Sequence, residues 1–174
     1  DLFVDLSVFE MFAPLTCGGS CLLVKHILDV QGDSVRDRGV TLVNTVPSAI
    51  VQLLESGPLP DSVRVVNLAG EALQRDLVDR LHAAGVPAVY NLYGPSEDTT
   101  YSTWERLDPA ERRTPPIGRG IAGTRCLVLD RDWYRAKMAR LVPRQVQGTA
   151  DWGPVTALLF RPWLLVSGIC WGLA

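Results

Sequence analysis

The segment from Asn91 to Glu97 combines residue types that could bind a nucleotide. It reads Asn-Leu-Tyr-Gly-Pro-Ser-Glu. The ring of Tyr93 could stack on a base, the hydroxyl of Ser96 could reach a phosphate oxygen, and the carboxylate of Glu97 could hold a hard cation such as Mg²⁺. A polar turn beside a buried tyrosine explains the same residues. On spacing alone, this structural interpretation is the favoured one.

The elements around this segment predict an α/β fold with a largely parallel sheet, because apolar runs alternate with amphipathic ones. Predicted strands span residues 21–24, 40–43, 63–68, 86–92, 99–104 and 125–129. Predicted helices span residues 7–15, 48–55 and 71–84, with Ser7 as an N-cap, Pro47 in a first turn and Gly85 as a stop. Ligands of such sheets bind beyond the carboxyl ends of the strands. The loops at 68–71 and 91–97 are therefore expected to form a site.

Composition excludes several classes of function. With 174 residues, 47% of them hydrophobic, the chain can bury one core. A net charge of −2 and scattered basic residues give no reason to expect nucleic acid or an anionic membrane as partner. The four cysteines form no Cys-x-x-Cys pair, which argues against zinc. No signal peptide is visible, so a cytoplasmic location is expected.

The last part of the chain differs from the rest. Residues 131–148 are basic without a steady period, and residues 152–174 are apolar with Arg161-Pro162 in the middle. A membrane span needs about 20 apolar residues, and a central arginine costs roughly 2.5–3.5 kcal/mol, so membrane association is disfavoured. We expect residues 1–130 to be one part of a domain, and residues 131–174 to be a divergent tail that is disordered or out of frame.

Five segments, in order, resemble motifs of the adenylate-forming, AMP-binding enzymes, and in particular the adenylation domains of nonribosomal peptide synthetases. Residues 91–97 resemble the signature loop Asn-x-Tyr-Gly-Pro-[Thr/Ser]-Glu. The other matching segments are residues 4–11 (Val-Asp-Leu-Ser-Val-Phe-Glu-Met), 44–48 (Asn-Thr-Val-Pro-Ser), 68–73 (Leu-Ala-Gly-Glu-Ala-Leu) and 115–119 (Pro-Pro-Ile-Gly-Arg). The resemblance covers residues 1–130. It implies an internal fragment with a partial doubly wound sheet from the family's large N-terminal subdomain.

The resemblance also implies roles toward ATP. Tyr93 would flank the adenine, and Asn91 would bond its amino edge. Ser96, where the family more often has threonine, would contact the α-phosphate, and Glu97 would ligate Mg²⁺. Gly70 would let the backbone approach the ligand closely.

Asp5 would bind the α-ammonium group of an amino acid, according to the same resemblance. A carboxylate in a low-dielectric pocket selects a cation, because leaving the carboxylate unpaired is costly. Activators of fatty or aryl acids have no ammonium group to bind. The alternative for Asp5 is a capping role ahead of Ser7.

The pocket for the substrate side chain would have mixed polarity. By resemblance it is lined by Leu6, Phe9, Asn44, Asn67, Ala69, Leu92, Thr100 and Tyr101. Phe9 and Tyr101 fill volume, which favours a small side chain. Alanine is the first prediction, with cysteine or serine behind it, although a methyl-sized difference is worth only about 1–3 kcal/mol.

The implied reaction converts an amino acid and ATP to aminoacyl-AMP and pyrophosphate, followed by transfer to the phosphopantetheine thiol of a peptidyl carrier protein. Three family features have no match here: the Gly-rich phosphate loop, the ribose-binding aspartate and the catalytic lysine. We therefore assign no catalytic residue, and expect the isolated chain to be inactive and to fold poorly. The alternatives are a fragment of an acyl- or aryl-acid CoA ligase, and a non-catalytic α/β module with a membrane-associated tail.

Overall fold

The computed structural model describes residues 6–95, 98, 100–128, 132 and 157–160. The chain forms two compact units, residues 1–119 and 120–174. Asp5, Ser96 and Glu97 lie outside the described residues, as does most of the predicted tail.

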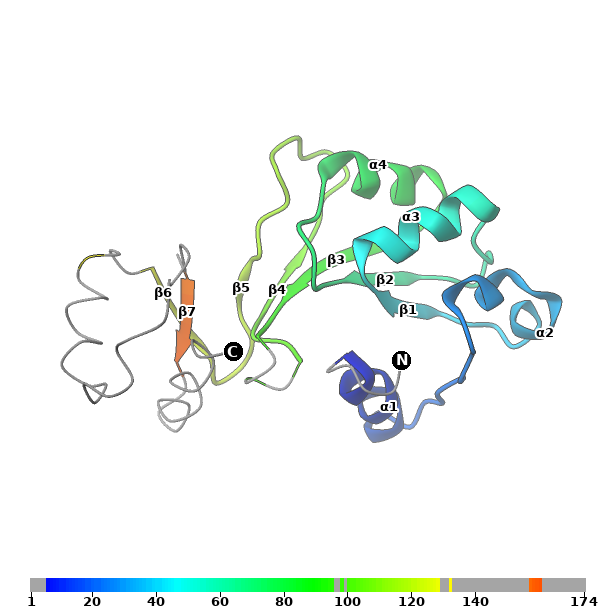
Figure 1. Ribbon diagram of the computed structural model, residues 1–174, viewed down its shortest axis with the longest axis horizontal. Helices are drawn as coiled ribbons and strands as arrows, with labels where there is room; N and C mark the ends of the chain where they lie inside the picture. Colours follow the sequence, from blue (N-terminus) through cyan, green and yellow to red (C-terminus); the bar gives the residue numbers. More distant parts are fainter. Residues whose placement is uncertain (1–5, 96–97, 99, 129–131, 133–156, 161–174) are drawn as a thin grey trace, which may run out of the picture. The chain divides into compact units, whose positions relative to one another are not determined.

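The first unit is built on a sheet with the strand order β1-β2-β3-β4-β5 (Figure 1). The first three strands, β1 (Leu42–Thr45), β2 (Val65–Leu68) and β3 (Ala88–Tyr93), run parallel, and β4 (Thr103–Arg106) is antiparallel to β3. The last strand, β5 (Arg119–Gly120), is very short. Parallel strands need crossover connections, which here are helices.

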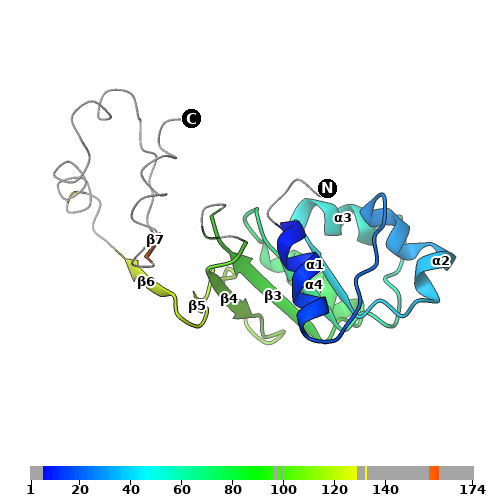
Figure 2. The same cartoon turned by 90° about the horizontal axis from the view of Figure 1, so that it is seen from below.

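Helices lie on both faces of this sheet. The crossover helices α3 (Pro47–Ser56) and α4 (Arg75–Ala83) lie over one face, and α1 (Leu6–Thr16) lies on the opposite side, in contact with β1 (Figures 1 and 2). Two short helices, η1 (Ile27–Gln31) and α2 (Asp33–Arg36), follow α1. The fold is a mixed α/β arrangement with a partial sheet, as predicted.

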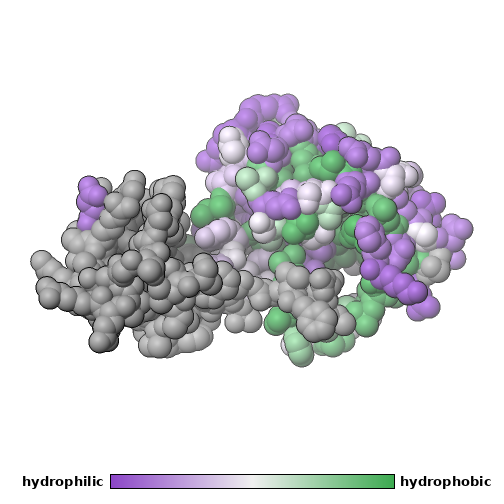
Figure 3. Space-filling view, viewed as in Figure 1, coloured by the Kyte–Doolittle hydropathy of each residue, from purple (hydrophilic) through white to green (hydrophobic). Residues whose placement is uncertain are grey.

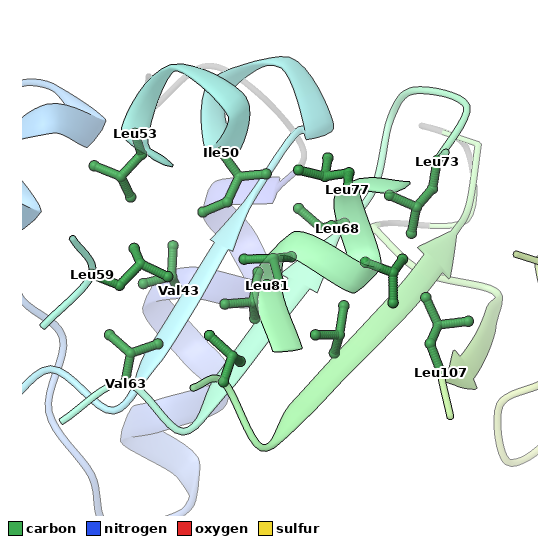
Figure 4. Packing of buried hydrophobic residues seen from close by; sticks show 14 of the residues in the cluster. Val43, Ile50, Leu53, Leu59, Val63, Leu68, Leu73, Leu77, Leu81 and Leu107 are labelled. Atoms are coloured by element: carbon green, nitrogen blue, oxygen red, sulfur yellow. The ribbon is translucent and has the colours of Figure 1, made fainter. Parts of the chain in front are cut away.

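The apolar core lies between the sheet and the two crossover helices (Figure 4). Strands contribute Val43, Val66 and Val89, which occupy matching register positions in neighbouring strands. Helices contribute residues such as Ile50 and Leu81, which are completely buried. Alternate residues of a strand point to opposite faces. The intervening residues of the same strands therefore face α1.

The surface of α1 turned away from the sheet is apolar. Val8, Phe12 and Leu15 are all exposed, and Phe12 is 59% exposed. Figure 3 shows this surface as a green region at the lower edge of the view, where α1 lies in Figure 1.

Some predicted elements need correction. Residues 21–24 form no strand; among the described residues no strand pairs with them, and Leu23 is 71% exposed. The predicted 71–84 helix begins only at Arg75, because Glu71 instead binds the start of α3. The predicted 99–104 strand is reduced to β4, since the residues before Thr103 belong to a loop. Ser7 is not an N-cap, because it lies inside α1.

Other element boundaries move by one or two residues. The prediction for α3 is confirmed, including Pro47 in the first turn. The predicted runs 40–43, 63–68 and 86–92 become β1, β2 and β3 as bounded above.

The second unit contains a two-stranded antiparallel sheet. Its strands are β6 (Arg125–Val128) and β7 (Ala157–Phe160), with Arg125 opposite Phe160. In the part of the chain that the structure describes, no helix is long and apolar enough to cross a membrane.

Candidate functional site

The face of the sheet that α1 approaches carries polar and aromatic side chains. Asn44 of β1 is opposite Asn67 of β2, and Asn67 is opposite Tyr90 of β3. Two residues further along β3, Leu92 is opposite Trp104 of β4. This row contains three of the predicted pocket residues, Asn44, Asn67 and Leu92, on one side of the sheet near the carboxyl ends of the strands.

Helix α1 and the loop before β4 meet at Asn44. The Asn44 Nδ2 donates to Glu10 Oε1 of α1 over 2.9 Å, and the Tyr101 hydroxyl donates to Asn44 Oδ1 over 2.8 Å. The rings of Phe9 and Tyr101 make an edge-to-face contact with centroids 5.2 Å apart. Such pairs add about 0.5–1.5 kcal/mol beyond their buried area. Three predicted pocket residues, Phe9, Asn44 and Tyr101, therefore form one connected group.

Tyr101 is held in its protonated form by its surroundings. Burial raises the pKa of Tyr101 to about 12, the negative charge of Glu10 adds to the rise, and the hydrogen bond with Asn44 acts in the opposite direction. Its hydroxyl is therefore a neutral donor at physiological pH.

The loop between β3 and β4 is tightly closed. The Ser102 amide donates to the Tyr93 carbonyl over 2.8 Å, and a Cβ on Gly94 would lie 2.5 Å from the Thr100 carbonyl oxygen. Thr100 is buried and has a φ of 87°, a strained value for a threonine. The Ser102 hydroxyl bonds the buried Asp98 carboxylate. Strain in this loop is balanced by these contacts, which fix the backbone on either side of Tyr101.

The turn after β2 brings backbone to the same edge of the sheet. Ala69 is buried, and its amide donates to the Thr45 carbonyl over 3.2 Å. Gly70 has a φ of 82°, which favours glycine. Glu71 then accepts hydrogen bonds from the Ser48 amide (2.9 Å) and the Ser48 hydroxyl (2.7 Å). Glu71 thereby ties this turn to the first turn of α3.

On the other side of β3 lie Asn91 and Tyr93, which alternate with Leu92. Asn91 is buried, and its Nδ2 donates to the Pro116 carbonyl over 2.8 Å. Its Oδ1 is the atom that could accept from an amino group. Tyr93 is 38% exposed, so the turn does not hold a buried tyrosine. An exposed ring can receive a purine, whereas a ring packed inside a structural turn cannot.

Three residues near the site, Glu10, Trp104 and Arg119, were missed by sequence reasoning. Glu10 shares a helix face with Leu6 and Phe9, at the spacing i, i+3, i+4, and this spacing could have revealed it. Arg119 lies 4.5 Å from the centre of the Trp104 ring, a cation–π contact that no sequence spacing predicts.

The metal prediction concerns residues that the structure does not describe. Within the described ranges, no group of three or more acidic, histidine or cysteine residues could hold a metal ion. Glu97, the predicted Mg²⁺ ligand, lies outside them, as do Asp5 and Ser96. Their roles remain predictions.

Comparison with known proteins identifies the class. The family model of the AMP-binding enzymes matches residues 1–147, so the chain belongs to that family of adenylate-forming ligases.

Within this family, the chain is a piece of an adenylation domain of the nonribosomal peptide synthetase type. It is 49% identical over 127 residues to a linear gramicidin synthase of Brevibacillus parabrevis, and the match covers 72% of this chain and 2% of the synthase. The chain thus spans a small fraction of the length of this relative.

Two solved structures share the fold. The nonribosomal peptide synthetase FmoA3 in its α-methyl-L-serine-AMP bound form aligns with a TM-score of 0.65 and 29% identity, covering 75% of this chain and 16% of that one. The Vibrio cholerae adenylation domain AlmE in complex with glycyl-adenosine-5'-phosphate aligns with a TM-score of 0.65 and 27% identity, covering 76% of this chain and 26% of that one.

Proposed function

We propose that this chain supplies the amino-acid pocket of an adenylation domain that activates a small amino acid, with alanine as the preferred substrate. The observation that supports this most strongly is the contact of Phe9, Asn44 and Tyr101, which come from a helix, a strand and a loop. They form one wall on the polar face of the sheet. A site built by such convergence suits a bound side chain better than a solvated surface does.

The reaction would join the amino-acid carboxylate to the α-phosphate of ATP. A carboxylate oxygen attacks the α-phosphorus, the bond to the β-phosphate oxygen breaks, and pyrophosphate leaves. Tyr93, Asn91 and Gly70 would hold the adenosine end, and Ser96 would contact the α-phosphate. Glu97 would hold Mg²⁺, which neutralises phosphate charge when bound.

Substrate choice would rest on charge at one end of the pocket and volume at the other. Asp5 comes directly before α1 and would pair with the α-ammonium group. The paired rings of Phe9 and Tyr101 would leave room for little more than a methyl group. That FmoA3 and AlmE are each solved with a small aminoacyl adenylate supports a small substrate.

Transfer of the aminoacyl group to the phosphopantetheine thiol of a carrier protein would follow, as expected for a module of a larger synthetase. A cytoplasmic location goes with this proposal, since ATP and carrier proteins are found there.

Amino-acid-dependent ATP–pyrophosphate exchange tests the proposal. The full polypeptide that carries these 174 residues should exchange with alanine most strongly, while the isolated 174-residue chain should stay at the blank. Exchange that no amino acid stimulates in the full polypeptide would overturn the proposal. Exchange stimulated only by aryl or fatty acids would favour the CoA-ligase alternative.

A further inference from the structure

We propose that Glu10 is a positioning residue for the amino-acid pocket, because its carboxylate fixes which way the Asn44 amide points and thereby where the Tyr101 hydroxyl donates. This inference deepens the proposed function and rests on it. Glu10 itself need not touch the substrate.

The three side chains form one continuous chain of hydrogen bonds. Glu10 Oε1 accepts from Asn44 Nδ2 at 2.9 Å, and Asn44 Oδ1 accepts from the Tyr101 hydroxyl at 2.8 Å. All three lie partly or fully out of water, and Tyr101 is 8% exposed. A hydrogen bond to an ionised acceptor is roughly twice as strong as a neutral one.

The polarity of this chain of bonds is determined at the Glu10 end. An ionised carboxylate only accepts hydrogen bonds, whereas an amide has one donating and one accepting end. Asn44 must therefore turn Nδ2 toward Glu10 and Oδ1 toward Tyr101. The reverse orientation would set Oδ1 against a carboxylate, and both groups would repel.

The consequence reaches the pocket through the tyrosine hydroxyl. Its single hydrogen is committed to Asn44, so no unpaired donor of Tyr101 faces an apolar substrate side chain. A buried donor without a partner is costly, and a pocket for a methyl group must avoid one.

The position of Glu10 on α1 supports a role in the site. Leu6, Phe9 and Glu10 are partly buried, whereas Phe12 and Leu15 are exposed. Glu10 therefore belongs to the face of the helix that approaches the sheet. A solvated acid would be expected among the exposed residues instead.

The substitution Glu10→Gln removes the fixed polarity and keeps the shape. A glutamine can donate to Asn44 Oδ1, which allows the amide to reverse and the Tyr101 hydroxyl to donate elsewhere. In ATP–pyrophosphate exchange by the full polypeptide, we expect KM for alanine to rise about tenfold. KM for ATP and kcat should change little, and uniform damage to the fold would not produce this split.

An Asn44→Ala background tests whether the effect passes through Asn44. In that background, Glu10→Gln should produce no further change in KM for alanine. The matched control is Glu55→Gln, an exposed acid on α3, which should leave KM unchanged. A Glu10→Gln effect of the same size in both backgrounds, or no effect in either, would overturn the proposal.

A second readout does not depend on activity. Unfolding midpoints of the full polypeptide with Glu10→Gln, Tyr101→Phe and both changes should be non-additive, because both act on the same amide. If wild-type polypeptide exchanges with no amino acid, the proposed function fails, and this cycle alone decides the hydrogen-bond chain. Additive midpoints would contradict that chain.

Discussion

The two faces of the sheet are made by alternate residues of the same strands, yet they differ in chemistry. The face under α3 and α4 presents Val43, Val66 and Val89, which join a completely apolar cluster. The face toward α1 presents Asn44 and Asn67 at the neighbouring positions. The first face can only stabilise the fold, whereas the second can also recognise a ligand. Stability and specificity should therefore respond to different substitutions.

The core face should show the largest effect on stability. Leu81 is fully buried, and Leu81→Ala should lower the free energy of unfolding by about 2–5 kcal/mol. Leu92, a half-buried leucine of the other face, is the matched control, and Leu92→Ala should cost clearly less. Urea denaturation followed by circular dichroism measures both. Equal losses would mean that the two faces do not differ as described.

Alkaline pH should destabilise the α1 face. Folding raises the pKa of Tyr101 from 10.0 to about 12, so the folded state favours the protonated phenol. This contribution, about 2–3 kcal/mol at two pKa steps, is complete below pH 10 and is lost as pH rises to about 12.

The corresponding variant is Tyr101→Phe, which should weaken the pH dependence of the unfolding midpoint between pH 10 and 12. Tyr90→Phe serves as the control, since its ring lies on the same face and should leave the profile in place. An unchanged profile in Tyr101→Phe would argue that this phenol is not the group involved.

The β3–β4 loop should tolerate no side chain at Gly94. The added Cβ of Gly94→Ala would meet the Thr100 carbonyl at 2.5 Å and Tyr101 Cα at 2.7 Å, both of them backbone atoms. We expect a loss of about 1–3 kcal/mol in unfolding free energy, together with weaker alanine-dependent exchange. Gly85→Ala is the comparison, because that position has open space and only its φ of 89° to accommodate. A Gly94→Ala variant with wild-type stability would contradict the close approach.

A smaller effect is expected at the start of α3. Glu71→Ala removes both hydrogen bonds to Ser48, and loss of such a cap costs about 0.5–2 kcal/mol. Glu55→Ala, at an exposed position of the same helix, should cost less. Thermal unfolding compares the two, and equal midpoints would show that Glu71 does not cap the helix.

Sequence reasoning predicted the parts of the fold that local pattern determines. Pro47 and the apolar period of α3 fixed that helix, and the alternation of strands and helices fixed the sheet. Residues 21–24 misled, because a short apolar run forms a strand only where a neighbouring strand offers hydrogen bonds. The late start of α4 was also missed, since it depends on Glu71 reaching Ser48, 23 positions away in sequence.

The site was predicted incompletely for the same reason. Motif resemblance pointed to Phe9, Asn44 and Tyr101, which the structure places in contact. Their connection through Glu10 depends on tertiary packing between α1 and β1, and no single motif contains it. The roles of Asp5, Ser96 and Glu97 remain predictions.

The most direct test of a small amino-acid pocket on the α1 face is the substrate profile of ATP–pyrophosphate exchange in the full polypeptide with Phe9→Ala. Removing this ring opens space beside Tyr101, so the ratio of valine to alanine in kcat/KM should rise by about tenfold or more. Leu81→Ala, on the core face, should leave the ratio unchanged. A Phe9→Ala variant that loses activity toward all amino acids equally, with the wild-type ratio, would contradict the assignment of this face as the pocket.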